Sequence, residues 1–201
     1  MWSQLPALLV GLIIAAYWAR VLRMARKIRR LAGHSANLIP PEPVGRLIRI
    51  IWIPITFLWV AIPLIVPFMQ FPPWILRPLY DLPVLQWAGF CVAAIAFVLT
   101  WICWKKMGKS WRMGIDPNET TSLIVTGPYA FIRHPIYALS SVLMLATVTA
   151  EPVPILIPIA VVHLIFLQLE ARREERHQAR VHGQMYLDYC AKTGGFFPRI
   201  S

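Results

Sequence analysis

The sequence GPYAFIRHPIY, residues 127–137, stands at the start of a long apolar run. Pro135 suits the first position of a helix, where its missing N–H group costs nothing. His134 is then the N-cap, and Tyr137 lies one turn later on the same side of the helix. The free N–H groups and the positive end of the helix dipole favour an anionic group beside His134. This stretch therefore predicts a helix with a polar site at its N-terminal end.

Composition indicates the kind of protein that carries this helix. Of the 201 residues, 58% are hydrophobic, and the mean hydropathy is +0.58. A soluble domain of this length is less apolar and carries more charge, so we expect an integral membrane protein. Each membrane span needs about 20 residues, which gives this chain room for about five. The expected fold class is therefore an all-α membrane protein with about five transmembrane helices and a charged C-terminal helix.

Apolar segments alternate with polar or proline-rich ones along a single membrane domain, 1–201. We expect three N-terminal spans within residues 1–104, with a basic loop at 20–46 and a proline-rich linker at 33–45. Residues 105–201 then contain a long polar loop, a tight helical hairpin at 135–169 and a C-terminal helix at 170–192. The apolar segments lie roughly at residues 2–19, 46–69, 84–104, 135–150 and 152–169.

The basic residues indicate how the chain crosses the membrane. In a soluble protein, a formal charge of +11 would favour nucleic acid as a partner. Here the charges flank apolar segments, so we expect contact with anionic lipid headgroups and no nucleic acid. When the loops are assigned to alternate sides, every lysine and arginine except Arg77 falls on one side. The positive-inside rule makes that side cytoplasmic. We therefore expect a bacterial inner-membrane protein with its N-terminus outside and its C-terminus and site in the cytoplasm.

Several polar residues have a simple interpretation and a functional one. Cys91, Cys103 and Cys190 have neither disulfide nor ligand spacing, so we expect no disulfide and no metal site. His163 falls near the middle of the fifth apolar segment, where an ionisable residue is a functional candidate. A neutral imidazole hydrogen-bonded between helices explains it equally well, and we prefer that interpretation. Arg133 and His134 alone would fit a pair at the membrane interface.

The charged tail has a regular pattern. On a helix, Glu170, Glu174 and Gln178 share one face, whereas Arg172 and Glu175 point further round. This pattern fits a charged helix lying on the membrane as well as it fits one wall of a site. The periodicity alone leaves both interpretations open.

Taken together, these motifs resemble the isoprenylcysteine carboxyl methyltransferase family, including its small prokaryotic five-span members. The matching elements are LIVTGPY at 123–129, RHPIY at 133–137 and the pair Glu174-Glu175. Gly183, Tyr186 and Tyr189 follow them at the family's spacing. The resemblance covers about residues 100–199.

The resemblance implies a membrane methyltransferase that uses S-adenosyl-L-methionine and releases S-adenosyl-L-homocysteine. It implies that the polar loop binds this cofactor on the cytoplasmic side. Arg172, Arg173 and Glu175 are the candidate catalytic residues. An arginine there, or Arg112, would orient an anionic acceptor, and Glu175 or His177 would accept a proton from an amine. The residues expected to bind the cofactor are Leu123, Ile124, Tyr129, Arg133, His134, Pro135, Tyr137 and Glu174.

The acceptor is expected to be a lipophilic small molecule or a lipid-modified group. O-methylation of a carboxylate like that of isoprenylcysteine is favoured, although Glu170 stands where eukaryotic members carry a substrate-binding arginine. The alternatives are a phospholipid or small-amine N-methyltransferase and a thiol S-methyltransferase. A reductase related to membrane sterol reductases is a weaker candidate. The alternative that is not an enzyme is a non-catalytic membrane sensor or assembly protein. The sequence leaves the oligomeric state open.

Overall fold

The computed structural model describes residues 4–32, 39–40, 42–115 and 122–199. Three parts of the sequence predictions lie outside these ranges. They are the start of the first apolar segment, most of the linker at 33–45, and residues 116–121 of the polar loop.

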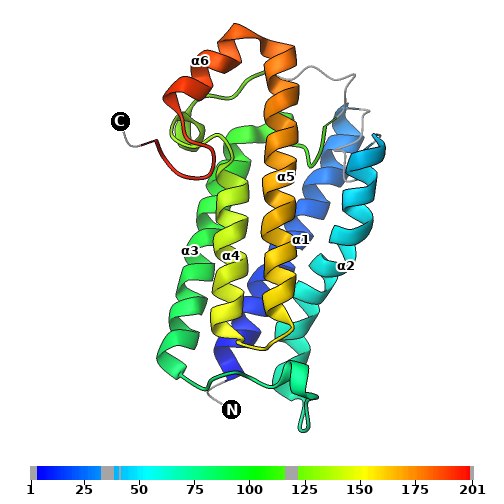
Figure 1. Cartoon of the computed structure of the whole chain (residues 1–201), viewed down its shortest axis with the longest axis vertical. Coiled ribbons are helices and arrows are strands. Elements are labelled where there is room, and N and C mark those ends of the chain that lie inside the picture. Colours follow the sequence, from blue (N-terminus) through cyan, green and yellow to red (C-terminus); the bar gives the residue numbers. More distant parts are fainter. Residues whose placement is uncertain (1–3, 33–38, 41, 116–121, 200–201) are drawn as a thin grey trace.

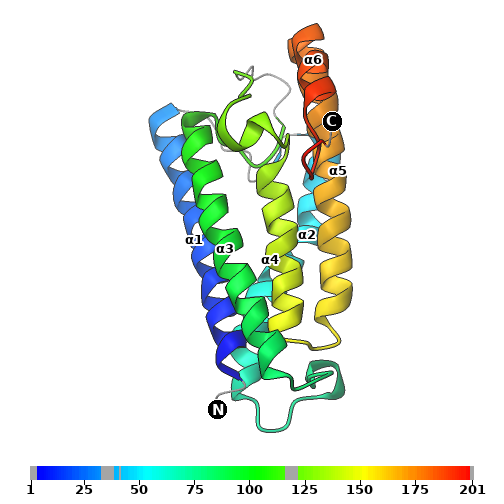
Figure 2. The same cartoon turned by 90° about the vertical axis from the view of Figure 1, so that its left-hand side faces the viewer.

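Five long helices lie side by side along the long axis of the molecule, and a sixth, short helix caps one end (Figures 1 and 2). The described residues form no β-strand; an isolated bridge pairs Ile132 with Gly194. The expected all-α class is confirmed. The helices are α1 (Leu5–Ala32), α2 (Pro43–Ile65), α3 (Pro83–Met107), α4 (Pro135–Ala150), α5 (Leu156–His182) and α6 (Gln184–Lys192).

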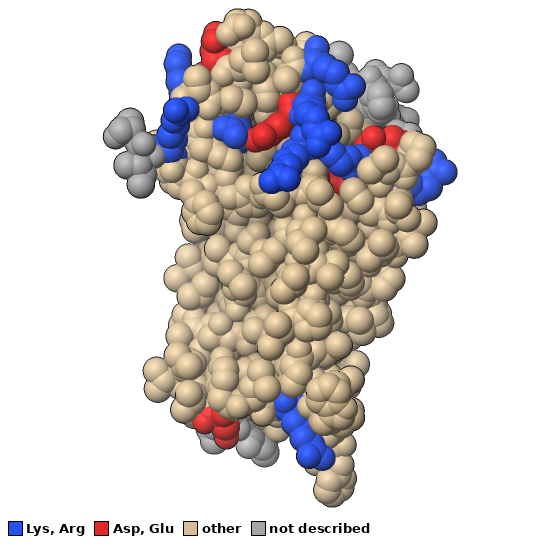
Figure 3. Space-filling view, in the orientation of Figure 1, with Lys and Arg blue, Asp and Glu red and all other residues tan. Residues whose placement is uncertain are grey.

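Helices α1, α2 and α3 are long and apolar enough to cross a membrane. Large apolar side chains such as Phe57 and Val98 are exposed on their outer faces, where lipid would cover them. Figure 3 shows the charged residues of one face gathered at the two ends of the molecule, with an uncharged band between them. Helix α4 is apolar but shorter, with 16 residues, and α5 becomes charged at Glu170.

The sequence predicted that one helix ends at residue 169 and another begins at residue 170, but the structure has no helix boundary there. Helix α5 continues from its apolar half through the charged half to His182 and ends at Gly183. Alanine, arginine, glutamate and glutamine are all good helix formers, so the change in polarity does not interrupt the backbone hydrogen bonds. Gly183 has φ +54°, a conformation that glycine adopts without steric cost. The chain therefore turns at Gly183, inside the C-terminal helix expected at 170–192, and α6 continues from there to Lys192.

Helix α2 also begins earlier than the predicted linker allowed. Pro43 occupies the start of the helix, with Glu42 as its N-cap. Proline is compatible with this position because the first helical N–H has no partner within the helix. Pro54 and Pro63 lie inside α2, as expected for a membrane helix whose neighbours satisfy freed backbone groups.

A buried polar cluster joins α2, α4 and α5 beneath the charged end. His163 is fully buried; the Trp52 indole N–H donates to its Nδ1 at 3.1 Å, and Ser140 Oγ lies 3.1 Å from its Nε2. Tryptophan is only a donor, so Nδ1 accepts and the proton of the neutral ring lies on Nε2. The geometry is that of a neutral histidine hydrogen-bonded between helices.

Helices α3 and α4 have the most extensive contact in the bundle, and Gly89 allows their close approach. A Cβ atom at Gly89 would lie 2.8 Å from the Ala146 carbonyl oxygen and 2.9 Å from the Ala150 nitrogen.

We predict that Gly89→Val lowers the free energy of unfolding by about 1–3 kcal/mol through overpacking. Thermal unfolding in detergent, followed by tryptophan fluorescence, measures this. The neighbouring Ala88 is exposed, so Ala88→Val is the matched control. Equal melting temperatures for the two variants would contradict the prediction.

Candidate functional site

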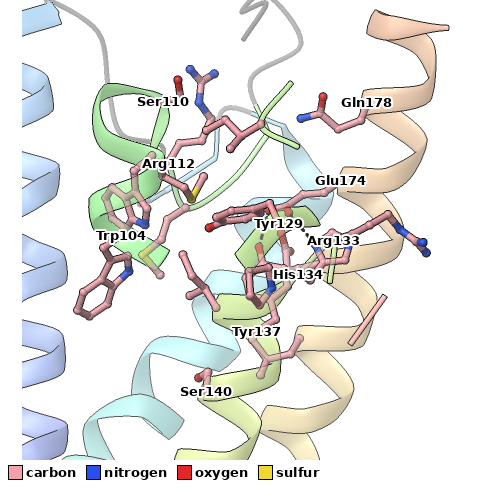
Figure 4. Close-up of a pocket in the computed structure, with 18 of the residues that line it drawn as sticks. Trp104, Ser110, Arg112, Tyr129, Arg133, His134, Tyr137, Ser140, Glu174 and Gln178 are labelled. Carbon is pink, nitrogen blue, oxygen red and sulfur yellow. Dashed lines mark hydrogen bonds and ion pairs between the residues drawn. The ribbon is translucent and has the colours of Figure 1, made fainter. Parts of the chain in front are cut away.

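A cavity opens at the end of the bundle where α4 begins (Figure 4). Its wall is mixed: the loop before α4 and the charged half of α5 supply polar groups, whereas α1, α2 and the apolar half of α5 supply aromatic and aliphatic ones. All the residues expected to bind the cofactor line this cavity. They are Leu123, Ile124, Tyr129, Arg133, His134, Pro135, Tyr137 and Glu174.

The N-terminal end of α4 has the predicted arrangement. The helix begins at Pro135 with His134 as its N-cap. The rings of His134 and Tyr137 stack with their centroids 5.5 Å apart and their planes 5° from parallel. This places an imidazole and a phenol on the same side of the first turn, at the wall of the cavity.

Two successive carboxylates of α5 meet this end of α4. His134 Nδ1 lies 3.5 Å from Glu174 Oε2, and His134 Nε2 lies 3.2 Å from Glu175 Oε1. A carboxylate only accepts hydrogen bonds, so this arrangement favours the imidazolium form of His134, in which both ring nitrogens can donate. Burial lowers the pKa of His134, but hydrogen bonds to Glu174 and Glu175 outweigh this and raise it above its ordinary value. The anionic group expected at the helix end is thus supplied by the chain itself.

Glu174 and Glu175 point in different directions. Glu174 lines the cavity and accepts a hydrogen bond from the Tyr137 hydroxyl. Glu175 lies outside the cavity lining and accepts a hydrogen bond from Arg133 Nε at 2.8 Å. Its hydrogen bond to His134, together with the Arg133 guanidinium, lowers the pKa of Glu175 to about 2. Glu175 is thus held between Arg133 and His134, and a carboxylate with so low a pKa is a poor proton acceptor.

The two predicted catalytic arginines also lie off the cavity. Arg172 is exposed on the outer side of α5. Arg173 forms ion pairs with Glu42 and Glu170, and so connects the start of α2 to α5. Of the arginines considered for orienting an acceptor, Arg112 lines the cavity (Figure 4).

Sequence reasoning missed Arg49 of α2. Its side chain lines the cavity, although it was grouped with the basic residues that signal topology. The guanidinium carbon lies 4.7 Å from the centre of the Trp52 ring, and Nη2 donates to the Met113 carbonyl oxygen. The sequence feature that could have identified Arg49 is its position within an isoleucine-rich stretch. Charged residues in such apolar segments usually have a function.

The C-terminal tail closes one side of the site. The Tyr189 hydroxyl donates to the Tyr129 carbonyl oxygen at 2.6 Å, and the backbone N–H of Arg133 donates to the Gly194 carbonyl oxygen at 2.8 Å. A Cβ atom at Gly194 would lie 1.7 Å from the Phe197 carbonyl oxygen, so this turn requires glycine. The tail thereby fixes the backbone from which Tyr129 and Arg133 project.

Several buried polar atoms in the cavity wall have no hydrogen-bond partner within the described part of the chain. Tyr129 and Trp104 present donors, and the side-chain oxygen of Gln178 is an acceptor. An uncompensated buried polar group is costly, so these atoms fit a ligand that offers both donors and acceptors. In the described part of the chain, no group of three or more His, Cys, Asp or Glu residues is arranged to hold a metal ion.

Membrane-length helices around a cavity with a charged, hydrogen-bonding mouth define an integral membrane protein with a binding site at one end. Comparison with known proteins finds a family that part of the chain resembles. Residues 87–180 match the model of the isoprenylcysteine carboxyl methyltransferase (ICMT) family. This match confirms the resemblance over just under half of the chain. The matched region runs from α3 through most of α5, and leaves out α1, α2 and α6.

Two curated relatives also align with the chain. One is the cobalt-zinc-cadmium resistance protein CzcN of Cupriavidus metallidurans, 26% identical over 58% of this chain and 55% of the relative. The other is the nickel-cobalt-cadmium resistance protein NccN of Alcaligenes xylosoxydans xylosoxydans, 28% identical over 47% of this chain and 45% of the relative. The chain spans about half the length of the curated relatives it matches.

The charge on His134 leads to a pH-dependent contribution to stability. Its pKa is raised in the folded protein, so the stabilisation is complete below the unfolded pKa and is lost as the pH rises through the folded pKa. We predict that the melting-temperature gap between the wild type and His134→Asn is largest near about pH 6 and shrinks toward about pH 9. Thermal unfolding in detergent across this range measures the gap. A gap that stays constant or widens with pH would show that His134 is not charged.

Proposed function

We propose that the protein is an S-adenosyl-L-methionine-dependent membrane methyltransferase that acts on a lipophilic or amphipathic acceptor. The observation that carries the proposal is the composition of one cavity. Every residue that the family resemblance assigns to the cofactor lines it, and its wall continues into apolar side chains of α1, α2 and α5. A water-soluble donor and a lipid-like acceptor can thus meet in one enclosure, where alignment of the reacting groups supplies much of the catalysis.

The donor end is the polar part of the cavity. Glu174 would bind the ammonium group of the methionine portion, and Tyr129 with Leu123 would border the adenine. When bound, the donor would supply an electrophilic methyl group to the acceptor atom, and its sulfonium sulfur would keep the electron pair of the bond that is broken. Glu174 is itself held by Tyr137 and His134, so its orientation is fixed before the donor arrives.

The acceptor end is the apolar part. Tyr17, Trp18 and Val21 of α1 and Phe166 and Leu167 of α5 line it. These side chains suit a hydrocarbon chain and offer little to a polar substrate. We favour O-methylation of a carboxylate like that of isoprenylcysteine, because a carboxylate is already nucleophilic and needs no strong base.

For the membrane arrangement, we propose five spans in a single domain, with α4 and the apolar half of α5 as a short hairpin beside α1, α2 and α3. The N-terminus would then lie outside, and the cavity mouth and C-terminus in the cytoplasm of a bacterial inner membrane. The concentration of lysine and arginine on alternate loops supports this orientation. Its partners would be the acceptor and membrane lipids, with no nucleic acid.

Replacing Glu174 tests the donor site. Glu174→Gln removes the charge that would pair with the ammonium, so we predict that the affinity for S-adenosyl-L-homocysteine falls about tenfold or more. Isothermal titration calorimetry of the purified protein in detergent measures it. Asp188 of α6 is exposed and lies off this cavity, so Asp188→Asn is the matched control. The assignment of Glu174 fails if its variant binds as the wild type does. Absence of binding to the wild type would overturn the proposed function.

The type of acceptor atom can be read from the product. We predict that membranes containing the protein, given S-adenosyl-L-methionine with a labelled methyl group, incorporate label into lipophilic material that mild base releases as methanol. Esters hydrolyse in base, whereas N-methyl and S-methyl groups persist. Membranes without the protein are the control. Base-stable label would redirect the proposal to an amine or thiol acceptor.

A further inference from the structure

We propose that Arg49 of α2 binds the carboxylate of the acceptor and so determines which lipophilic molecules enter the cavity. This inference rests on the proposed function, because it concerns the second substrate of the same site. Arg49 lies before the family-matched region, which begins at residue 87, so the comparisons assign it no role.

Arg49 is a buried cation that forms no ion pair with a carboxylate of the described residues. Only 4% of its surface is exposed. Its guanidinium contacts the face of Trp52 and the carbonyl oxygen of Met113, which are uncharged. Its Nε is buried and has no hydrogen-bond partner among the residues that the structure describes. Burial of a guanidinium without a counterion is strongly unfavourable, so a charged partner from outside the chain would stabilise this arrangement.

Glu170 is the carboxylate with which Arg49 would otherwise be expected to pair. It lines the same cavity, and Arg49 is close enough for its charge to lower the pKa of Glu170 against the effect of burial. Glu170 is, however, held by Arg173, which donates to its Oε1 and also pairs with Glu42. Arg173 thus offsets the Glu170 charge locally, and Arg49 remains available to a ligand.

The surroundings of Arg49 fit the head of an amphipathic molecule. On its own helix, Ile48 and Trp52 line the cavity beside it, and Leu167 lines it from α5. Glu174, which we assign to the donor, lies one turn beyond Glu170 on the same face of α5. A carboxylate bound at Arg49 therefore has apolar wall for its hydrocarbon portion and lies toward the donor end.

A carboxylate fits this position better than a phosphate. A guanidinium with one nitrogen already committed offers few N–H groups and a single positive charge, which match a monoanion. A phosphate monoester carries more charge and needs more donors. An interaction through a partly committed guanidinium also holds the acceptor in place without quenching its nucleophilicity, as efficient methyl transfer requires.

The test compares a carboxylate with its neutral ester. The probes are N-acetyl-S-farnesyl-cysteine and its methyl ester, titrated into the full-length protein in detergent. We expect the wild type to bind the acid more tightly than the ester. Arg49→Gln should weaken binding of the acid about 10- to 100-fold, as expected for a charge-assisted hydrogen bond. Binding of the ester and of S-adenosyl-L-homocysteine should stay unchanged, and Arg49→Lys should restore part of the preference.

Arg20 provides a matched control. Its guanidinium carbon also lies 4.7 Å from the centre of a tryptophan ring, that of Trp101, but Arg20 does not line the cavity. Arg20→Gln should leave all three affinities unchanged. An equal loss of acid and ester binding in Arg49→Gln would make Arg49 a structural residue and overturn the inference, as would a wild type that does not prefer the acid. Failure of the wild type to bind S-adenosyl-L-homocysteine would overturn the proposed function alone, because the comparison of acid with ester does not depend on the donor.

Discussion

The contact between the N-terminal end of α4 and the carboxylates of α5 sets the geometry of the cavity. His134 lies between Glu174 and Glu175, and Arg133 adds a second cation to Glu175. Two basic residues before α4 and two carboxylates of α5 are thus partly shielded from water, where charge–charge attraction is stronger than at an open surface. The contact also neutralises groups that a membrane protein could not otherwise bury near its apolar core. The wall formed by Tyr129, Tyr137 and Glu174 depends on it.

The local features of this contact could be predicted from the sequence. Proline after histidine specified the start of α4, and helical spacing placed Glu170, Glu174 and Gln178 on the face that lines the cavity. The roles of Arg173 and Glu175 could not be predicted in this way, because their ion-pair partners, Glu42 and Arg133, come from distant parts of the chain. Periodicity gives the direction of a side chain and says nothing about its partner. For the same reason the change from apolar to charged residues suggested a boundary at 170 that the backbone of α5 does not have.

The cavity is assembled from two kinds of sequence. The family-matched region supplies α4, the preceding loop and most of α5, whereas α1 and α2 lie outside it and supply much of the apolar wall. Their apolar composition resembles that of any membrane helix, and no motif surrounds Arg49, so its position among isoleucine residues was the single sign that it belongs to a site. The polar half of the cavity is thus specified by motifs, and the apolar half by packing. We expect the apolar half to determine the selectivity for the acceptor.

The unbroken course of α5 has a consequence for changes in chain length. Leu167, Glu170, Glu174 and Gln178 line the cavity from one face of a single helix. Each residue of an α-helix turns the chain by about 100°, so inserting or deleting one residue between Leu167 and Glu174 would rotate one end of this face out of the cavity. Substitutions along α5 alter the site one contact at a time, whereas a length change of one residue changes the alignment of its apolar half with its charged half. The distance along the chain between these residues is therefore as much a part of the site as the residues themselves.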